Sequence, residues 1–392
     1  MTLLNQDTIT GVLGAGTMGS GIAQVAAQNG HPTRLFDVSQ AALDKARAGH
    51  EKIMNRLVEK GRITRENADA TLGRISYHDQ LDGLAGSGLI IEAIIENLDI
   101  KKDVFGKLET LLGEHAVLAT NTSSLSIASI GAACSKPERV VGVHFFNPAP
   151  LMPLVEIIPG IASSDDVVSA TRALIDGWGK VTVLAKDTPG FIVNRVARPF
   201  YGEAVRLLEE GVADAATIDW ALRDIGGFRM GPFQLMDFIG NDINFKVTQT
   251  VWEAFFYDPR YRPSFTQQRL VESGRLGRKS GRGYYEYGDN ATPAEPNKDQ
   301  ALGAAIVSRI VAMLINEAVD AVFLQIASPE DVDLAMTKGV NYPKGLLAWA
   351  NQRGLDHVLT ELKELQEEYG EDRYRPSPLL KRMVRDGRKF FE

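Results

Sequence analysis

A glycine-rich turn near the N-terminus constrains the fold of this chain more than any other feature. The apolar run ITGVLG, residues 9–14, ends in Gly14, and Gly16 and Gly19 follow at the start of a stretch with helical composition. The first glycine of such a turn permits a sharp bend, the second lets a pyrophosphate approach the backbone, and the third lets the helix pack closely on the strand. The amide groups of that helix end then face the phosphates. The segment therefore predicts a strand, a phosphate-binding turn and a helix.

An acidic residue at the end of the next predicted strand sharpens this prediction. Asp37 lies in the segment 34–38, which follows the helix and its stop at Gly30. A carboxylate about 20 residues after the glycines accepts hydrogen bonds from the adenosine ribose and repels a 2′-phosphate. A glycine turn that binds nothing is the structural alternative, and the acid argues against it. The unit predicts an NAD-dependent oxidoreductase that prefers NAD over NADP.

Several short apolar runs predict the rest of a sheet. Helical segments such as 39–60 and 97–112 separate most of them, an alternation typical of a mostly parallel sheet with helices on both faces. The candidate strands are 88–93, 117–121, 140–145, 154–158 and 181–185. We therefore predict an α/β Rossmann-type N-terminal domain over residues 1–187.

The character of the sequence changes at the segment DTPG. Thr188 is expected to cap a helix whose first turn contains Pro189. Beyond this point amphipathic helical segments continue to the C-terminus. The sequence predicts an all-α C-terminal region.

The helical half contains an internal repeat. Three segments recur at a nearly constant offset: Glu203-Ala204 as Glu317-Ala318, Ile218-Asp219 as Val332-Asp333, and Arg260-Tyr261-Arg262-Pro263-Ser264 as Arg373-Tyr374-Arg375-Pro376-Ser377. A five-residue identity in register with two further matches indicates a duplication. We predict two tandem helical repeats, over 188–287 and 301–392, joined by the polar linker 288–300.

Composition excludes several classes of protein. A formal net charge of -7 argues against a nucleic-acid partner, which needs a basic stripe. Cys134 is the only cysteine, so no intrachain disulfide and no CxxC metal site is expected, as in a reducing cytosol. Neither a secretory signal nor an apolar stretch long enough to span a membrane is expected. The sequence predicts a cytoplasmic enzyme.

A histidine and a glutamate on neighbouring predicted strands are the candidate catalytic pair. A dehydrogenase needs a base that takes the hydroxyl proton as hydride leaves the same carbon. In VVGVHFFNPAPLMPLVEII, His144 ends one strand, Glu156 lies on the next, and a proline-rich reversal brings them together. A carboxylate beside an imidazole fixes its tautomer and favours its protonated form. The other histidines are expected to be ordinary surface or core residues: His31, His50, His78, His115 and His357.

Four segments of the chain resemble signature segments of the 3-hydroxyacyl-CoA dehydrogenases. They are NTSSLSI (121–127), GVHFFNPAP (142–150), DTPGFIVNR (187–195) and MGPFQLMDFIG (230–240). The duplicated helical half, with GVNYPKGLLAW and EDRYRPSPLL, is similar to the phenylacetate-pathway subgroup, which oxidises 3-hydroxyadipyl-CoA. The resemblance implies NAD-dependent oxidation of (S)-3-hydroxyacyl-CoA to 3-oxoacyl-CoA, in fatty acid metabolism or phenylacetate catabolism.

The resemblance also implies roles for individual residues. His144 would be the base and Glu156 its orienting partner, while Ser123 and Asn194 would hydrogen-bond the 3-oxygen of the substrate and help to hold the nicotinamide. Four further residues would line the cofactor with the glycines and Asp37: Glu96, Lys101, Asn121 and Asn147. On its own, Ser123 fits a helix cap equally well, and Asn194 fits a polar residue of a first helical turn.

Three alternatives stay open at this point. They are a short-chain 3-hydroxybutyryl-CoA dehydrogenase, a non-catalytic NAD-binding structural relative, and a dehydrogenase of a free hydroxy acid. The complete set of candidate catalytic residues argues against the second, and the HFFNP and GFIVNR segments argue against the third. Pro153 and Arg229 depart from the family pattern, which leaves the acyl chain open. Arg229 is a candidate for binding an ω-carboxylate.

The duplication has an expected structural consequence. The resemblance implies that single-copy members dimerise through the helical domain around a two-fold axis. A second copy joined by a short linker is present at a very high effective concentration. We expect it to dock on the first copy as an internal pseudo-dimer, and a homodimer of the full chain stays open.

Overall fold

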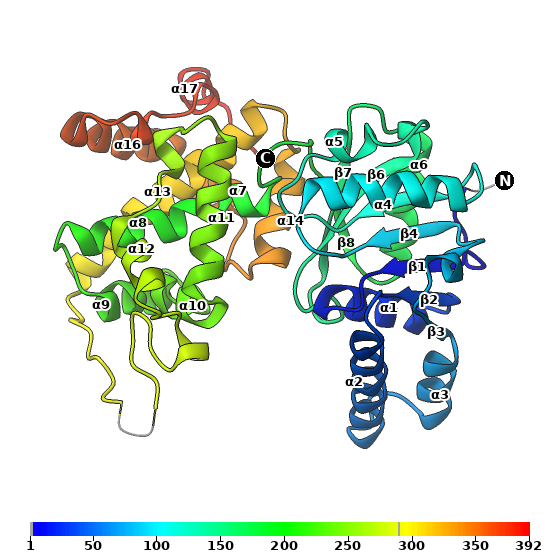
Figure 1. The fold of residues 1–392 in the computed structure, drawn as a ribbon. Helices are drawn as coiled ribbons and strands as arrows, with labels where there is room; N and C mark the ends of the chain where they lie inside the picture. The colour runs from blue at the N-terminus through cyan, green and yellow to red at the C-terminus, as the bar shows by residue number, and fades with distance from the viewer. Residues whose placement is uncertain (1–2, 289–290) are drawn as a thin grey trace. The chain divides into compact units, whose positions relative to one another are not determined.

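The structure is a computed structural model that describes residues 3–288 and 291–392. It divides into two compact units, Met1–Phe191 and Ile192–Glu392 (Figure 1). Within the predicted linker, residues 289–290 lie outside the described residues, and 291–299 lead as irregular chain into a helix that begins at Gln300. The first unit is an α/β unit and the second is helical, which confirms the predicted fold class.

The first unit contains one eight-stranded sheet with the order β3-β2-β1-β4-β5-β6-β7-β8. The strands are β1 (Thr10–Leu13), β2 (Thr33–Phe36), β3 (Ile75–His78), β4 (Leu89–Glu92), β5 (Val117–Thr120), β6 (Val140–Phe145), β7 (Leu154–Pro159) and β8 (Val181–Leu184). Only the β6–β7 pair is antiparallel among these strands. The prediction of a mostly parallel sheet is therefore confirmed, with β3 as an additional strand at one edge.

Helices cover both faces of this sheet (Figure 1). They are α1 (Thr17–Gln28), α2 (Gln40–Glu59), α3 (Arg65–Gly73), α4 (Leu98–Leu111), α5 (Ile127–Gly131) and α6 (Asp165–Gly177). Val141 and Val143 of β6 belong to the core cluster that contains α1 and α6. Gly142 lies between them and faces the other side, where an added Cβ would come within 2.8 Å of Ile127 in α5. Alternate strand residues thus pack on opposite helical layers.

The second unit is built from helices around one long central helix. They are α7 (Val193–Val196), α8 (Arg198–Glu209), α9 (Ala215–Trp220), α10 (Pro232–Ile239), α11 (Asn241–Ala254), α12 (Phe265–Glu272), α13 (Gln300–Phe323), α14 (Pro329–Gly339), α15 (Leu346–Arg353), α16 (Leu355–Tyr369) and α17 (Pro378–Arg385). By length and composition alone α13 could cross a membrane, so the expectation that no apolar stretch is long enough to span one was wrong. Its residues from Ile310 to Ala321 are buried inside the unit, as in the core helix of a globular protein.

The expected helix start at Thr188 is wrong. The chain turns at Gly190 (φ 74°) and Phe191 (φ 47°), and α7 begins at Val193. The hydroxyl of Thr188 donates to the carbonyl of Lys186, so it does not cap a helix. The left-handed backbone at these two residues is incompatible with a helix that starts before them.

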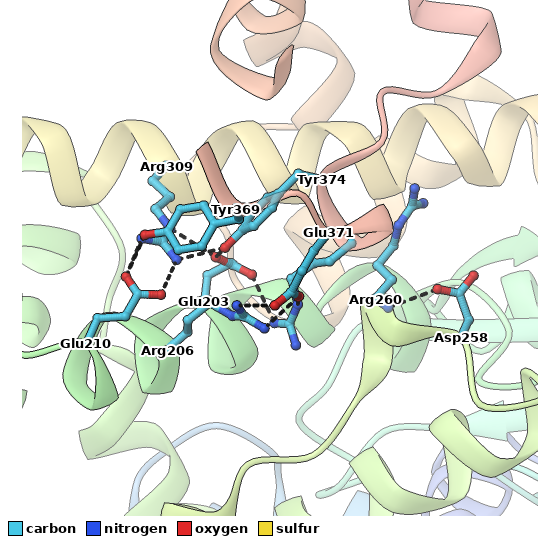
Figure 2. Close-up of polar contacts among 10 residues, drawn as sticks. Glu203, Arg206, Glu210, Asp258, Arg260, Arg309, Tyr369, Glu371 and Tyr374 are labelled. Carbon is cyan, nitrogen blue, oxygen red and sulfur yellow. Dashed lines mark hydrogen bonds and ion pairs between the residues drawn. The ribbon is translucent and has the colours of Figure 1, made fainter. Parts of the chain in front are cut away.

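Two buried glutamates organise the second unit. Glu203 of α8 accepts hydrogen bonds from Arg309, Arg373 and Tyr374, at 3.1, 3.1 and 3.0 Å. Figure 2 shows Arg309 and Tyr374 directed at this carboxylate. Glu317 of α13 is the repeat counterpart of Glu203, and it accepts from the counterpart residues, which are Arg195, Arg260 and Tyr261. Each carboxylate is therefore bound by residues of the other predicted copy.

Candidate active site

The glycine turn lies at the carboxyl end of β1. Gly14 has φ +103°, and an added Cβ at Gly19 would lie 1.8 Å from the carbonyl oxygen of Gly14. A Cβ at Gly16, in contrast, would meet nothing within 4 Å, so space is open beside the backbone there. Gly16 is also the N-cap of α1, whose first turn has neither a side-chain cap nor an acidic residue. An open space against uncapped amides fits a dinucleotide pyrophosphate.

Asp37 lies beside this turn at the end of β2. Its Oδ2 accepts a hydrogen bond from the amide of Ala15 at 2.7 Å, and its Oδ1 accepts from the amide of Ser39 at 2.9 Å. The side chain is partly exposed. The carboxylate thus holds the glycine turn and retains an exposed side for the adenosine ribose.

A buried ion pair lies at the ends of β4 and β5. Glu92 is fully buried, and its carboxylate accepts from the ammonium of Lys101 at 2.6 Å and from the hydroxyl of Thr120 at 2.7 Å. Lys101 is only 1% exposed, and its ammonium also lies 3.4 Å from Glu96. Sequence reasoning missed Glu92, although an acid that ends the apolar run GLIIEA was a usable signal.

Glu96 connects this ion pair to the segment that follows β5. Its carboxylate accepts hydrogen bonds from the hydroxyl of Thr122 at 2.7 Å and from the amide of Ser123 at 3.0 Å. Burial by itself would raise the pKa of Glu96, but the hydrogen bond from Thr122 and the charge of Lys101 outweigh burial and lower it. The carboxylate is therefore held as an anion that fixes the backbone at Ser123.

His144 and Glu156 are paired directly across the antiparallel strands β6 and β7. Residues opposite each other in such a pair place their side chains on one face, about 5 Å apart. The Nδ1 atom of His144 lies 2.7 Å from Oε2 of Glu156, and both residues are buried. A carboxylate at Nδ1 keeps the proton on that nitrogen and leaves Nε2 to accept one. The arrangement can therefore work as an oriented base.

The segment between β6 and β7 is held from both sides. The Oδ1 atom of Asn121, which follows β5, accepts from the amide of Phe145 at 2.8 Å. The half-buried ammonium of Lys180 donates to the carbonyls of Ala149 and Met152, at 2.6 and 2.9 Å, and burial lowers its pKa. Asn147 is exposed within this segment. Lys180, which sequence reasoning missed, thus positions the connection between the strands that carry His144 and Glu156.

We expect Lys180→Met to loosen this connection. The variant loses two charge-assisted hydrogen bonds, which lowers the free energy of unfolding by about 2 kcal/mol. Because the same segment lines a cavity between α1 and α2, the KM for a ligand of that cavity should rise more than the KM for NADH. Thermal unfolding and steady-state kinetics measure both effects. Lys186→Met, at an exposed lysine nearby, is the matched control, and equal behaviour of the two variants would contradict the role of Lys180.

A cavity of about 950 Å³ opens from the glycine turn between α1 and α2. Gly16 and Thr17 lie at its edge, and Pro148, Pro150 and Leu151 line it from the β6–β7 connection. Its basic lining residues are Lys45, Arg56, Lys60 and Arg62. Such a volume with an apolar wall and a cationic rim suits a large anionic ligand.

The remaining predicted residues lie in the second unit. Asn194 is on the short helix α7 and is half-buried, and Arg229 is exposed before α10. In the first unit, most of the predicted residues lie at or near the carboxyl ends of the parallel strands or on the β6–β7 pair: Gly14, Gly16, Gly19, Asp37, Glu96, Lys101, Asn121, Ser123, His144 and Glu156. Asn147 is exposed on the connection between β6 and β7.

Two family models match the chain over most of its length. The one described as "3-hydroxyacyl-CoA dehydrogenase, NAD binding domain" matches residues 9–188. The one described as "3-hydroxyacyl-CoA dehydrogenase, C-terminal domain" matches residues 190–287 and 306–389.

Individual relatives agree with these matches. The 3-hydroxyadipyl-CoA dehydrogenase of Escherichia coli K12 is 40% identical over 97% of this chain and 98% of its own. A crystal structure of a 3-hydroxybutyryl-CoA dehydrogenase from Escherichia coli K12 superimposes with a TM-score of 0.91 at 39% identity, over 97% of this chain and 98% of that one. A crystal structure of (S)-3-hydroxybutyryl-CoA dehydrogenase from Ralstonia eutropha gives a TM-score of 0.70 at 38% identity, over 72% of this chain and 100% of that one. These findings confirm the resemblance seen in the sequence, and the chain belongs to the 3-hydroxyacyl-CoA dehydrogenase family, whose N-terminal domain binds NAD.

Proposed function

We propose that His144 is the base that accepts the hydroxyl proton when this enzyme oxidises (S)-3-hydroxyacyl-CoA to 3-oxoacyl-CoA. The observation that carries this proposal is the 2.7 Å contact between His144 Nδ1 and Glu156. Glu156 holds the imidazole so that Nε2 accepts the proton, and it stabilises the imidazolium that forms. NAD, which the glycine turn and Asp37 would hold, would supply the hydride acceptor for C3.

The other site residues bind and position the reactants in this proposal. Ser123 and Asn194 hydrogen-bond the 3-oxygen, while the glycine turn and Asp37 bind the pyrophosphate and ribose. Asn121 and Asn147 lie next to the cofactor. Because Lys101 is buried against Glu92, we propose that it acts through Glu96, as a positioning residue for the segment at Ser123.

The cavity between α1 and α2 is the proposed binding region for the acyl-CoA. Its basic residues Lys45, Arg56, Lys60 and Arg62 suit the phosphates of coenzyme A, and its apolar wall suits the rest of the molecule. The relatives named above differ in acyl chain, one adipyl and others butyryl. We favour an ω-carboxylated chain, and butyryl is the second candidate.

A kinetic panel tests the proposed function. Purified protein is assayed with NADH and three substrates: acetoacetyl-CoA, 3-oxohexanoyl-CoA and 3-oxoadipyl-CoA. We expect NADH oxidation with at least one of them and no oxidation with the free acids. No turnover with any of the three would favour a non-catalytic NAD-binding protein instead.

Cofactor preference gives a separate expected result. A carboxylate that binds the ribose and repels a 2′-phosphate contributes about 3 kcal/mol, so kcat/KM for NADH exceeds that for NADPH by roughly 100-fold. Asp37→Ala narrows this preference, mainly by weakening NADH. Asp69→Ala, at an exposed aspartate of α3, should leave the preference unchanged. Equal use of both cofactors by the unmodified enzyme would refute the role of Asp37.

We also propose that the second unit is an internal pseudo-dimer of residues 188–287 and 301–392. The contacts of Glu203 and Glu317 support this proposal. In a two-fold symmetric interface, each residue of one copy contacts the same partner residues in the other copy, as these two glutamates do. Only the first copy carries the GFIVNR segment, and Ser308 stands where Asn194 would align. In this proposal the first copy serves catalysis and the second supports it.

A further inference from the structure

Arg198, the first residue of α8, is a buried arginine without an acidic partner in the part of the chain that the structure describes. It is 7% exposed, and its Nη1 donates to the hydroxyl of Thr248 at 3.2 Å. Its guanidinium lies 4.9 Å from the ring centre of Tyr201. Its Nε is buried and has no hydrogen-bond partner.

Other buried arginines of this unit are different. Arg195, Arg260 and Arg373 each contact a buried glutamate. A buried cation is costly unless an anion and hydrogen bonds compensate for its lost hydration. At Arg198 the cost is visible, because burial lowers its pKa and only the tyrosines Tyr201 and Tyr342 oppose that effect.

A second unsatisfied donor lies near this arginine. The hydroxyl of Tyr342 is buried without a hydrogen-bond partner, and Tyr342 is near enough to act electrostatically on Arg198. The ring of Tyr342 lies 5.7 Å from that of Phe200, which is two residues after Arg198. A carboxylate, with two acceptor oxygens, is the group that would satisfy both a guanidinium N–H and a phenol O–H. The chemistry of these two side chains therefore suits an anionic group of a ligand.

The spacing of Arg198 from Asn194 indicates which anionic group could reach it. Arg198 follows Asn194 by four residues, and Ala197 joins α7 to α8 with helical backbone angles. Residues four apart lie on one face of a helix, about 6 Å apart along its axis. In a six-carbon acyl chain, C3 and the ω-carboxyl carbon are three bonds apart, roughly 4 Å when extended. A chain whose 3-oxygen is bound at Asn194 is long enough to bring its ω-carboxylate to Arg198.

We propose that Arg198, with Tyr342, binds the ω-carboxylate of a dicarboxylic acyl-CoA substrate and so determines the acyl-chain specificity of the enzyme. This proposal rests on the proposed function, in which Asn194 contacts the 3-oxygen. It replaces Arg229, the candidate from the sequence, which is exposed.

The test compares two substrates of equal length, 3-oxoadipyl-CoA and 3-oxohexanoyl-CoA, with NADH. We expect the unmodified enzyme to prefer the adipyl substrate. Arg198→Met removes the charge at similar volume, and it should lower the ratio of kcat/KM for adipyl to hexanoyl by roughly 100-fold. Arg198→Lys keeps a charge and should recover part of the ratio. Arg229→Met is the matched control, and its ratio should equal that of the unmodified enzyme.

The outcomes separate this proposal from the proposed function. If the unmodified enzyme reduces both substrates with the same kcat/KM, Arg198 does not bind a carboxylate, although the dehydrogenase function stands. If Arg198→Met lowers both values equally, Arg198 is only structural and the proposal is wrong. If Arg198→Met does not fold, the proposal can be tested on the unmodified enzyme. Adipyl-CoA should then raise the Tm of the unmodified enzyme more than hexanoyl-CoA does, and equal shifts of the Tm would overturn the proposal.

Discussion

His144→Gln is expected to lower kcat by at least about 100-fold, because general-base catalysis is worth 100-fold to 10,000-fold. Binding of NADH should stay nearly unchanged, since the glycine turn and Asp37 are untouched. Steady-state kinetics with a 3-oxoacyl-CoA and titration with NADH measure the two quantities. His115→Gln, at an exposed histidine, is the matched control. Turnover of His144→Gln at the unmodified rate would refute the assignment of the base.

Glu156→Gln tests whether the pair acts as one unit. The substitution keeps the size of the side chain but removes the charge that stabilises the imidazolium and holds the proton on Nδ1. We expect kcat to fall by about 100-fold or more. Because the two residues work together, the double variant should lose little more than His144→Gln alone. Fully additive losses would mean that Glu156 and His144 act independently.

Glu317→Gln is expected to lower the free energy of unfolding by about 3 kcal/mol, because it leaves the buried Arg195 without its counter-charge and leaves Arg260 with Asp320 as its acidic partner. Glu317 is completely buried between Arg195 and Arg260. Burial alone would raise the pKa of Glu317, but the two arginines outweigh burial and lower it. Its contribution to stability is therefore present above the ordinary glutamate pKa and lost as the pH falls through the lower value in the folded protein. Denaturant unfolding at several pH values measures both effects.

A control variant and a truncated chain test the same contacts. Glu364→Gln, at an exposed glutamate of α16, is the matched control and should unfold like the unmodified protein. A chain that ends at residue 300 lacks Arg309, Arg373 and Tyr374, which bind Glu203, and it lacks α13, so the apolar face of α8 that packs on α13 becomes exposed to water. This chain should aggregate or form intermolecular dimers. If it stays a soluble, fully active monomer, the internal pseudo-dimer is refuted.

Local patterns were enough to predict most of the first unit. The glycine spacing, the acid at Asp37 and the apolar runs each depend on neighbours within one βαβ element, and the sheet follows from their alternation. The strand β3 was missed because its sequence ISYH carries polar residues and lies at an edge of the sheet. The pairing of His144 with Glu156 was predictable because only a short reversal separates the two strands.

Contacts between distant segments were harder to predict. The start of α7 was placed too early because Thr188 and Pro189 carry a helix-start pattern, whereas the positive φ angles at Gly190 and Phe191 depend on tertiary packing. Arg198 reads as an ordinary charged residue of an amphipathic helix, and its burial becomes visible only when α8, Thr248 and Tyr342 are brought together. The sequence of α8 alone does not predict that Arg198 lies close to Thr248 and Tyr342.

The reciprocal contacts of Glu203 and Glu317 also have a consequence for how the sequences of the two copies can evolve. In an assembly of identical subunits, one codon change alters both sides of a symmetric interface at once. Here every position is encoded once, so the two halves can drift apart. Ser308, the counterpart of Asn194, already hydrogen-bonds Arg353 and Glu361 instead. Mutation and selection can therefore act separately on the two copies, so that the first copy is optimised for catalysis and the second for stability. Glu203 and Glu317 meanwhile hold the two copies together.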